Sequence, residues 1–167
     1  MEEWSENKKE KYITLKGYAG TGKTYLVSHI YKYLLNKGSR VEVCAPTHKA
    51  AQVLNSKIGY NKAITIHSFL GLILKKDFNG GYEIKPSPYR DIPSDCIVLM
   101  DESSMIGEIL WEYIEETYNI TWLFIGDPAQ LPPVNEKASK VFEIPGVELT
   151  KIVRQAEGNP IISLASK

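Results

Sequence analysis

Short apolar runs alternate along the chain with longer segments whose apolar residues recur every three or four positions. The apolar runs are Tyr12–Lys16, Val41–Ala45, Cys96–Met100, Thr121–Ile125 and Val147–Thr150. Runs of this length and composition are typical of strands that are buried on both faces of a parallel sheet. Their alternation with helical segments predicts an open α/β sheet, in which ligands bind at the carboxyl ends of the strands.

Three segments, at about 23–36, 49–57 and 103–118, have the spacing expected of one apolar face of a helix. Gly38 and Gly59 follow the first two segments and predict where those helices end. The expected buried faces are Leu26, Val27, Ile30 and Leu34 in the first segment and Ile106, Leu110, Tyr113 and Ile114 in the third.

Two places depart from this alternation. Within Leu72–Lys85, the pair Asn79-Gly80 is a strong turn signal between runs rich in Leu, Ile, Phe and Tyr, and it predicts a β-hairpin. Near the end of the chain, Asn159 and Pro160 have the residue types of a helix start, yet only seven residues follow them. Because a helix starting there would be cut short, we expect the chain to be a fragment of a longer protein.

Composition excludes several classes of protein. The chain has 167 residues, of which 43% are apolar and 24% charged, values typical of a globular domain and not of a disordered chain. No apolar run approaches the ~20 residues that span a membrane, so we expect no membrane partner. Cys44 and Cys96 lie in short apolar runs, which predicts buried thiols in a reducing compartment and a cytoplasmic location.

The charges balance overall but are unevenly spread. The chain has 20 basic and 20 acidic residues, which gives a net charge of zero. Between Ala45 and Arg90 there are seven Lys or Arg against two acids, whereas Asp101–Ile120 has six acids and no Lys or Arg. This asymmetry predicts a basic face and an acidic face.

Residues 17–24 (GYAGTGKT) match the phosphate-binding loop G-x-x-x-x-G-K-[ST], with a predicted strand before them and a helix after them. Glycines let backbone N–H groups turn inward around a phosphate, and the helix N-terminus adds its positive dipole end. Lys23 would reach the β- and γ-phosphates of ATP, and the Thr24 hydroxyl would bind Mg²⁺. The predicted nucleotide-binding residues of the loop are Gly17, Gly20, Thr21, Gly22, Lys23 and Thr24.

Polar residues follow two further predicted strands. Asp101 and Glu102 follow one of them, so Asp101 can hold Mg²⁺ while Glu102 orients and deprotonates the attacking water. Gln130 lies in a loop stiffened by glycine and proline after the other strand, and it can touch both a γ-phosphate and its water.

Taken in order, six motifs of the chain resemble those of superfamily 1 DNA helicases, most closely the RecD-like and phage Dda-like branch. They are 17–24, 45–51 (APTHKAA), 65–68 (TIHS), 101–104 (DESS), 126–133 (GDPAQLPP) and 149–155 (LTKIVRQ). The resemblance implies a P-loop NTPase fold of the RecA-like type. It further implies ATP hydrolysis coupled to 5′-to-3′ movement on single-stranded DNA and unwinding of a duplex fork.

The resemblance also implies roles for individual residues. Arg154 corresponds to an arginine that reaches the γ-phosphate and would act with Lys23, Glu102 and Gln130 in catalysis. The residues implied in binding single-stranded DNA are Pro46, Thr47, His48 and Lys49, together with Thr65, His67 and Ser68.

In domain terms, 1–70 and 91–167 would form the first RecA-like motor domain. Residues 71–90 would be a hairpin insertion and a candidate strand-separating pin, with Phe78 and Tyr82 at the first base pair. Family members carry a second RecA-like domain, which this chain does not supply, and a glutamine segment that binds adenine upstream of the phosphate loop. The first glutamine here is Gln52, so we expect that segment to be missing from these residues.

Two other functions are compatible with the motifs. A stand-alone P-loop ATPase or switch would need no DNA, whereas a non-enzymatic module would bind ATP or DNA without turnover. Stimulation of hydrolysis by single-stranded DNA distinguishes a helicase motor from both.

Overall fold

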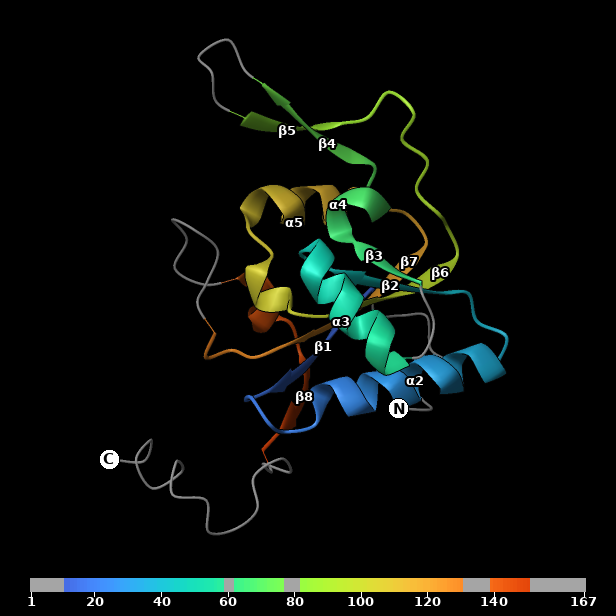
Figure 1. Cartoon of the computed structure of the whole chain (residues 1–167), viewed down its shortest axis with the longest axis vertical. Coiled ribbons are helices and arrows are strands. Elements are labelled where there is room, and N and C mark those ends of the chain that lie inside the picture. The colour runs from blue at the N-terminus through green and yellow to red at the C-terminus, as the bar shows by residue number, and fades with distance from the viewer. Residues whose placement is uncertain (1–10, 59–61, 77–81, 131–138, 151–167) are drawn as a thin grey trace.

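The computed structural model of the chain describes residues 11–58, 62–76, 82–130 and 139–150. Six parallel strands form one sheet in the order β3-β2-β6-β7-β1-β8, and two antiparallel strands form a separate hairpin (Figure 1). The strands are β1 (Tyr12–Gly17), β2 (Val41–Ala45), β3 (Ala63–Thr65), β4 (Leu72–Lys76), β5 (Tyr82–Pro86), β6 (Cys96–Met100), β7 (Ile120–Gly126) and β8 (Gly146–Leu149). The helices are α2 (Lys23–Asn36), α3 (His48–Ile58), α4 (Ile66–Phe69) and α5 (Glu108–Glu115), with 3₁₀ turns at Ser103–Met105 and Lys140–Glu143.

All five strands predicted from apolar runs are confirmed, and no strand bound differs from its prediction by more than one residue. The parallel α/β sheet is confirmed as well. The strand that the sequence pattern misses is β3, which pairs with the end of β2 at the edge of the sheet. Its three residues are too few to show a pattern, and its middle residue, Ile64, is exposed.

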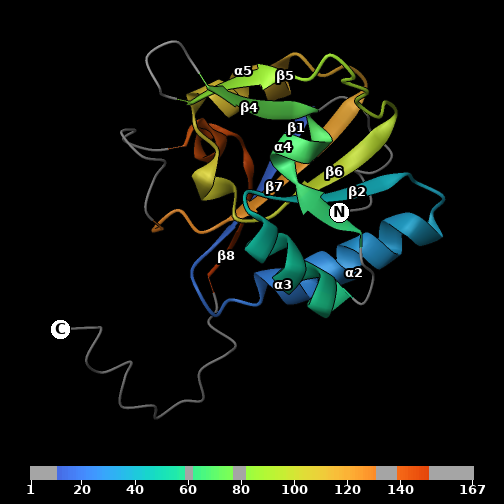
Figure 2. The same ribbon diagram turned by 45° about the horizontal axis from the view of Figure 1, so that its top comes forward.

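Helices cover both faces of the sheet (Figures 1 and 2). Successive residues of a strand point to opposite faces, so each central strand contributes to two cores. In β7, Trp122 and Phe124 pack with α4 and α5, while Leu123 and Ile125 pack with α2 and α3. This burial on both faces explains why the central strands are continuous apolar runs.

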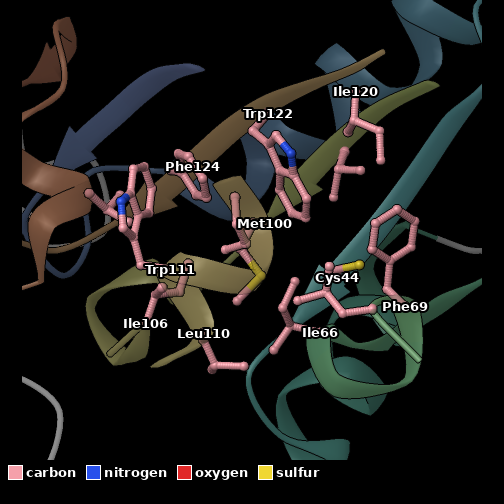
Figure 3. Packing of buried hydrophobic residues seen from close by; sticks show 14 of the residues in the cluster. Cys44, Ile66, Phe69, Met100, Ile106, Leu110, Trp111, Ile120, Trp122 and Phe124 are labelled. Atoms are coloured by element: carbon pink, nitrogen blue, oxygen red, sulfur yellow. The ribbon is translucent and has the colours of Figure 1, made fainter. Parts of the chain in front are cut away.

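The core on the side of α4 and α5 is rich in aromatic rings (Figure 3). The rings of Trp122 and Phe124 stack with centroids 5.7 Å apart, and Phe69 of α4 meets Trp122 edge-on at the same distance. The indole N–H of Trp122 donates to the Thr117 hydroxyl at 3.2 Å, so the polar atom of this buried ring is satisfied. Trp111 of α5 completes the cluster against Phe124.

The first two helices lie close to their predicted bounds. Of the face predicted for α2, Val27, Ile30 and Leu34 are buried and Leu26 is half-buried. Gly38 ends α2 in a left-handed conformation, as predicted. α3 extends one residue beyond its prediction at each end, and Gly59 lies outside the described residues.

The single helix predicted over 103–118 is wrong. A 3₁₀ turn occupies Ser103–Met105, the backbone then becomes extended at Ile106 and Gly107, and α5 starts only at Glu108. The hydroxyl of Ser139, far along the chain, donates to the Ile106 carbonyl at 2.8 Å. This contact satisfies a carbonyl that would otherwise need a helical partner, so the break is stable.

Because α5 starts late, its buried face also differs from the prediction. Ile106, Leu110 and Ile114 are buried as expected, but Tyr113 is only half-buried. Trp111, which the prediction omits, contributes a large buried ring.

The predicted hairpin is confirmed and extends away from the sheet (Figure 1). Its two segments are joined at the base, because the Ser87 N–H donates to the Gly71 carbonyl and Arg90 Nε donates to the Leu70 carbonyl, each at 2.8 Å. Arg90 also donates to Glu116 at the end of α5 at 3.4 Å. Leu72 is buried in the core beneath it. The turn at Asn79-Gly80 and Phe78 lie outside the described residues.

The prediction of one basic face is wrong, because the basic residues of 45–90 divide between two places. Lys49 and Lys57 lie on α3, whereas Lys75, Lys76 and Lys85 lie on the hairpin, whose base packs with the opposite core. Four of the six acids of Asp101–Ile120 lie on α5 or at its C-terminal end, and the other two, Asp101 and Glu102, follow β6. Across the part of the chain that the structure describes, we find no helix with the length and apolarity needed to cross a membrane.

Trp122→Ala should lower the free energy of unfolding by about 3–5 kcal/mol, because it empties the centre of the aromatic cluster. Tyr118→Ala is the matched control, since this ring is 84% exposed and its loss should change stability by less than about 0.5 kcal/mol. Urea unfolding followed by circular dichroism measures both. Equal effects would show that the cluster does not stabilise the fold.

Candidate active site

Because the strands are parallel, the loops that follow β3, β2, β6, β7 and β1 meet along one edge of the sheet. A cleft of about 1050 Å³ lies at this edge. Its lining includes seven of the predicted site residues, namely Thr24, Pro46, Thr47, Lys49, Asp101, Glu102 and Gln130. The structure thus brings together residues that come from four separate loops.

The phosphate-binding loop leaves β1 at Gly17 and enters α2 at Lys23. Gly22 caps this helix with φ of +86°, a left-handed conformation that favours glycine and turns the backbone into the helix. The Thr21 hydroxyl and Lys23 Nζ donate to the Tyr18 carbonyl at 2.8 and 3.0 Å, and Lys23 Nζ also donates to the Gly17 carbonyl at 2.6 Å. These bonds hold the ammonium group over the loop, beside the free N–H groups of the helix start, where an anion is favoured.

The acid pair, Asp101 and Glu102, follows β6. The Asp101 N–H donates to the Cys44 carbonyl of β2 at 2.9 Å, which fixes the start of the turn against the neighbouring strand. The pKa of Asp101 is raised to about 6, chiefly by burial and also by the charge of Glu102. A hydrogen bond to the Glu102 backbone and the charges of Lys23 and Lys57 oppose this rise. A buried carboxyl of this kind is stabilised in its charged form when a cation lies beside it.

Thr24 and Asp101 line the same cleft and offer one hydroxyl and one carboxylate. This donor set fits Mg²⁺, which prefers oxygen ligands and keeps several positions for water and phosphate. The residues present are therefore compatible with the predicted metal.

Glu102 has φ of +53° and ψ of 40°, the left-handed region that residues other than glycine seldom adopt. This conformation turns the chain sharply from β6 into the 3₁₀ turn. This backbone conformation costs roughly 1 kcal/mol, and the residue that adopts it is the predicted general base itself.

Gln130 lies on the loop after β7. The Asp127 carboxylate accepts from the Ala129 N–H at 2.9 Å, and the Asp127 carbonyl accepts from the Gln130 N–H at 3.1 Å. The side-chain oxygen of Gln130 accepts from the Ser104 hydroxyl at 2.9 Å. The roles of Asp127 and Ser104 were not predicted from the sequence, although both residues lie within the motifs 126–133 and 101–104.

The two elements predicted to bind DNA follow the adjacent strands β2 and β3, so they lie side by side. Their two threonines cap helices: the Ala50 N–H donates to the Thr47 hydroxyl, and the Ser68 N–H donates to the Thr65 hydroxyl, each at 3.1 Å. Thr65 is only 5% exposed, so its hydroxyl builds the turn and offers little surface for a ligand.

Most residues of these elements face solvent. Thr47, His48, Lys49 and Ser68 are exposed, and Pro46 and His67 are half-buried. Burial lowers the pKa of His67, so its imidazole is neutral at neutral pH. Arg154 lies outside the described residues, and its predicted role stays a prediction.

One face of α3 contributes positively charged side chains to the lining of the cleft. Lys49, Val53 and Lys57 are spaced by four residues and all line the cleft. The cleft therefore has lysines along one wall and the two acids on another.

Comparison with known proteins identifies similar sequences. A profile described as "AAA domain" matches residues 6–167. The chain is 32% identical over 160 residues to the ATP-dependent RecD2 DNA helicase of Deinococcus radiodurans, an alignment that covers 93% of this chain and 21% of that protein. It is also 32% identical over 170 residues to the ATP-dependent DNA helicase Dda of Enterobacteria phage T4, covering 95% of this chain and 38% of that protein.

The fold is similar to that of Bacteroides Pif1 solved with single-stranded DNA, with a TM-score of 0.62, 24% identity, and coverage of 99% of this chain and 44% of that one. The chain spans less than half the length of each of these three proteins.

Glu102→Gly should raise the free energy of unfolding by about 0.5–1 kcal/mol, because glycine adopts the left-handed conformation without strain. As a control, Glu112→Gly in the exposed part of α5 should lower it by about 1 kcal/mol. Thermal unfolding of the two variants gives the sign of each change. A loss of stability in Glu102→Gly would show that the turn is not strained.

Proposed function

The chain belongs to the AAA domain family and to the RecD- and Dda-like branch of superfamily 1 helicases, and we propose that it is the first RecA-like motor domain of an ATP-dependent DNA helicase. The full protein would hydrolyse ATP, move 5′ to 3′ along single-stranded DNA and separate a duplex at a fork. The observation that carries this proposal is a cleft whose lining includes Thr24 of the phosphate-binding motif, the acid pair Asp101 and Glu102, Gln130 and the lysines of α3.

At the nucleotide end of the cleft, backbone N–H groups of the loop and the Lys23 ammonium would bind the phosphates of ATP. Thr24 and Asp101 would hold Mg²⁺, which neutralises charge on phosphate oxygens when bound. Glu102 would accept the proton of the attacking water, and Gln130 would orient that water and contact the γ-phosphate.

Pro46–Lys49, which contributes to the lining of the same cleft, and the turn at Thr65–Ser68, which follows the neighbouring strand, would contact single-stranded DNA. The exposed His48, Lys49 and Ser68 suit sugar and phosphate contacts that do not depend on sequence. Thr47 and Thr65 would support these contacts by capping α3 and α4.

Three parts of the proposal depend on residues or domains beyond the described site. A second RecA-like domain of the same protein would close over the ATP and supply further DNA contacts. Arg154 would reach the γ-phosphate, and the hairpin within 71–90 would act as the strand-separating pin. An insertion with this role fits a hairpin that extends away from the sheet (Figure 2).

Lys23→Ala should weaken MgATP binding by about 1.5–3 kcal/mol, because it removes a charge-assisted contact to phosphate. Lys32→Ala is the matched control, since this lysine is exposed on the same helix and far from the loop in sequence. Isothermal titration calorimetry measures both variants. Unchanged affinity in Lys23→Ala would remove the phosphate-binding assignment.

Binding of a labelled oligo(dT) should weaken steeply with salt, with a slope of about −0.7 in log–log form per phosphate neutralised. Lys49→Ala should make this slope shallower by about 0.7, whereas Lys140→Ala should not change it, because Lys140 pairs with Glu108 beside α5. Fluorescence anisotropy across a salt series provides the measurement. Absence of binding at low salt would favour the alternative, a stand-alone P-loop ATPase or switch.

A further inference from the structure

Two adjacent serines after the acid pair tie the turn that follows β6 to the end of β7. The Ser103 hydroxyl donates to the Ile125 carbonyl at 2.8 Å, and the Ser104 hydroxyl donates to the Gln130 side-chain oxygen at 2.9 Å. Gly126 permits the first contact, since a Cβ there would come within 2.9 Å of the Ser103 hydroxyl oxygen. The two serines that follow the proposed general base Glu102 are thus bonded to β7 and to Gln130, the proposed γ-phosphate contact.

The two serines differ in what they hold. Ser103 is fully buried, and its acceptor is a backbone carbonyl inside the sheet, so its bond stabilises the fold locally. Ser104 is only 2% exposed, yet its acceptor is an exposed side chain, and both Ser104 and Gln130 line the cleft. Ser104 therefore acts on a group that a ligand can reach.

A glutamine amide has two ends of nearly equal size and opposite chemistry. Its oxygen only accepts hydrogen bonds, and its nitrogen only donates them. A γ-phosphate presents acceptor oxygens alone, so a productive contact requires that the amide nitrogen faces it. Without a fixed partner, an exposed glutamine rotates about three side-chain bonds and must lose this freedom on binding.

We propose that Ser104 is a positioning residue that sets the orientation of the Gln130 amide and thereby lets the site distinguish a nucleoside triphosphate from a diphosphate. In the structure the serine hydroxyl donates to the amide oxygen, which leaves the amide nitrogen for the γ-phosphate. A hydroxyl can also accept a hydrogen bond, but only this arrangement satisfies the serine and the acceptor oxygens of a γ-phosphate together. A diphosphate lacks this group, so its binding does not use the contact. This inference rests on the proposed nucleotide site.

The test compares two probes, the non-hydrolysable triphosphate AMP-PNP and ADP, each with MgCl₂, by calorimetry on the chain as it stands. Ser104→Ala should weaken AMP-PNP binding about fivefold, the equivalent of one hydrogen bond of about 1 kcal/mol, and leave ADP binding within about twofold. Ser104→Thr, which keeps the hydroxyl, should restore the preference. Ser103→Ala is the matched control and should lower thermal stability while weakening neither nucleotide selectively.

Repeating the Ser104 substitution in a Gln130→Ala variant makes the test independent of any folding defect at the buried serine. In Gln130→Ala, which changes an exposed side chain, the AMP-PNP preference should already be lost, and adding Ser104→Ala should lower it no further. An equal loss for both probes in Ser104→Ala would overturn the inference, as would a full additional loss in the double variant.

Failure of the inference can be separated from failure of the proposed function. If Lys23→Ala weakens both probes while Ser104→Ala affects neither, the nucleotide site stands and the positioning role is wrong. If Lys23→Ala leaves both probes unaffected, the nucleotide site itself is wrong.

Discussion

The central strands β6 and β7 are buried on both faces, and this constraint decides where polar chemistry can occur in the domain. A charged side chain within these strands would lie in an apolar core without a partner. Polar residues are therefore concentrated where the strands end, and parallel pairing brings those ends to one edge. The cleft with Asp101, Glu102 and Gln130 follows from this arrangement.

The site contains two features that lower the stability of the folded state. Asp101 carries a carboxyl whose pKa is raised by burial, and Glu102 adopts a left-handed backbone conformation. Both follow directly after a strand that the core holds firmly from two sides. The aromatic cluster around Trp122 and Phe124 packs on the face of the sheet that α4 and α5 cover. Its burial stabilises the sheet and offsets the free-energy cost of the buried carboxyl and of the left-handed residue.

Much of this arrangement could be predicted from the sequence, because the relevant signals are local. Apolar runs identify five strands, and the spacing of Gly17–Thr24 identifies the phosphate-binding loop. What could not be predicted depends on contacts between distant segments. The helix break at Gly107 is stabilised by Ser139, and the orientation of Gln130 depends on Ser104. No local pattern of residues contains such contacts, and β3 is too short to have a pattern at all.

The attachment of the hairpin has a mechanical consequence. The two segments at its base are bonded to each other, from Arg90 to the Leu70 carbonyl and from Ser87 to Gly71, and Arg90 also donates to Glu116 at the end of α5. Leu72 is buried in the core shared by α4 and α5, on the opposite side of the sheet from α2. A load applied to the hairpin would therefore enter the domain through this aromatic core, on the face of the sheet away from the helix that follows the phosphate-binding loop.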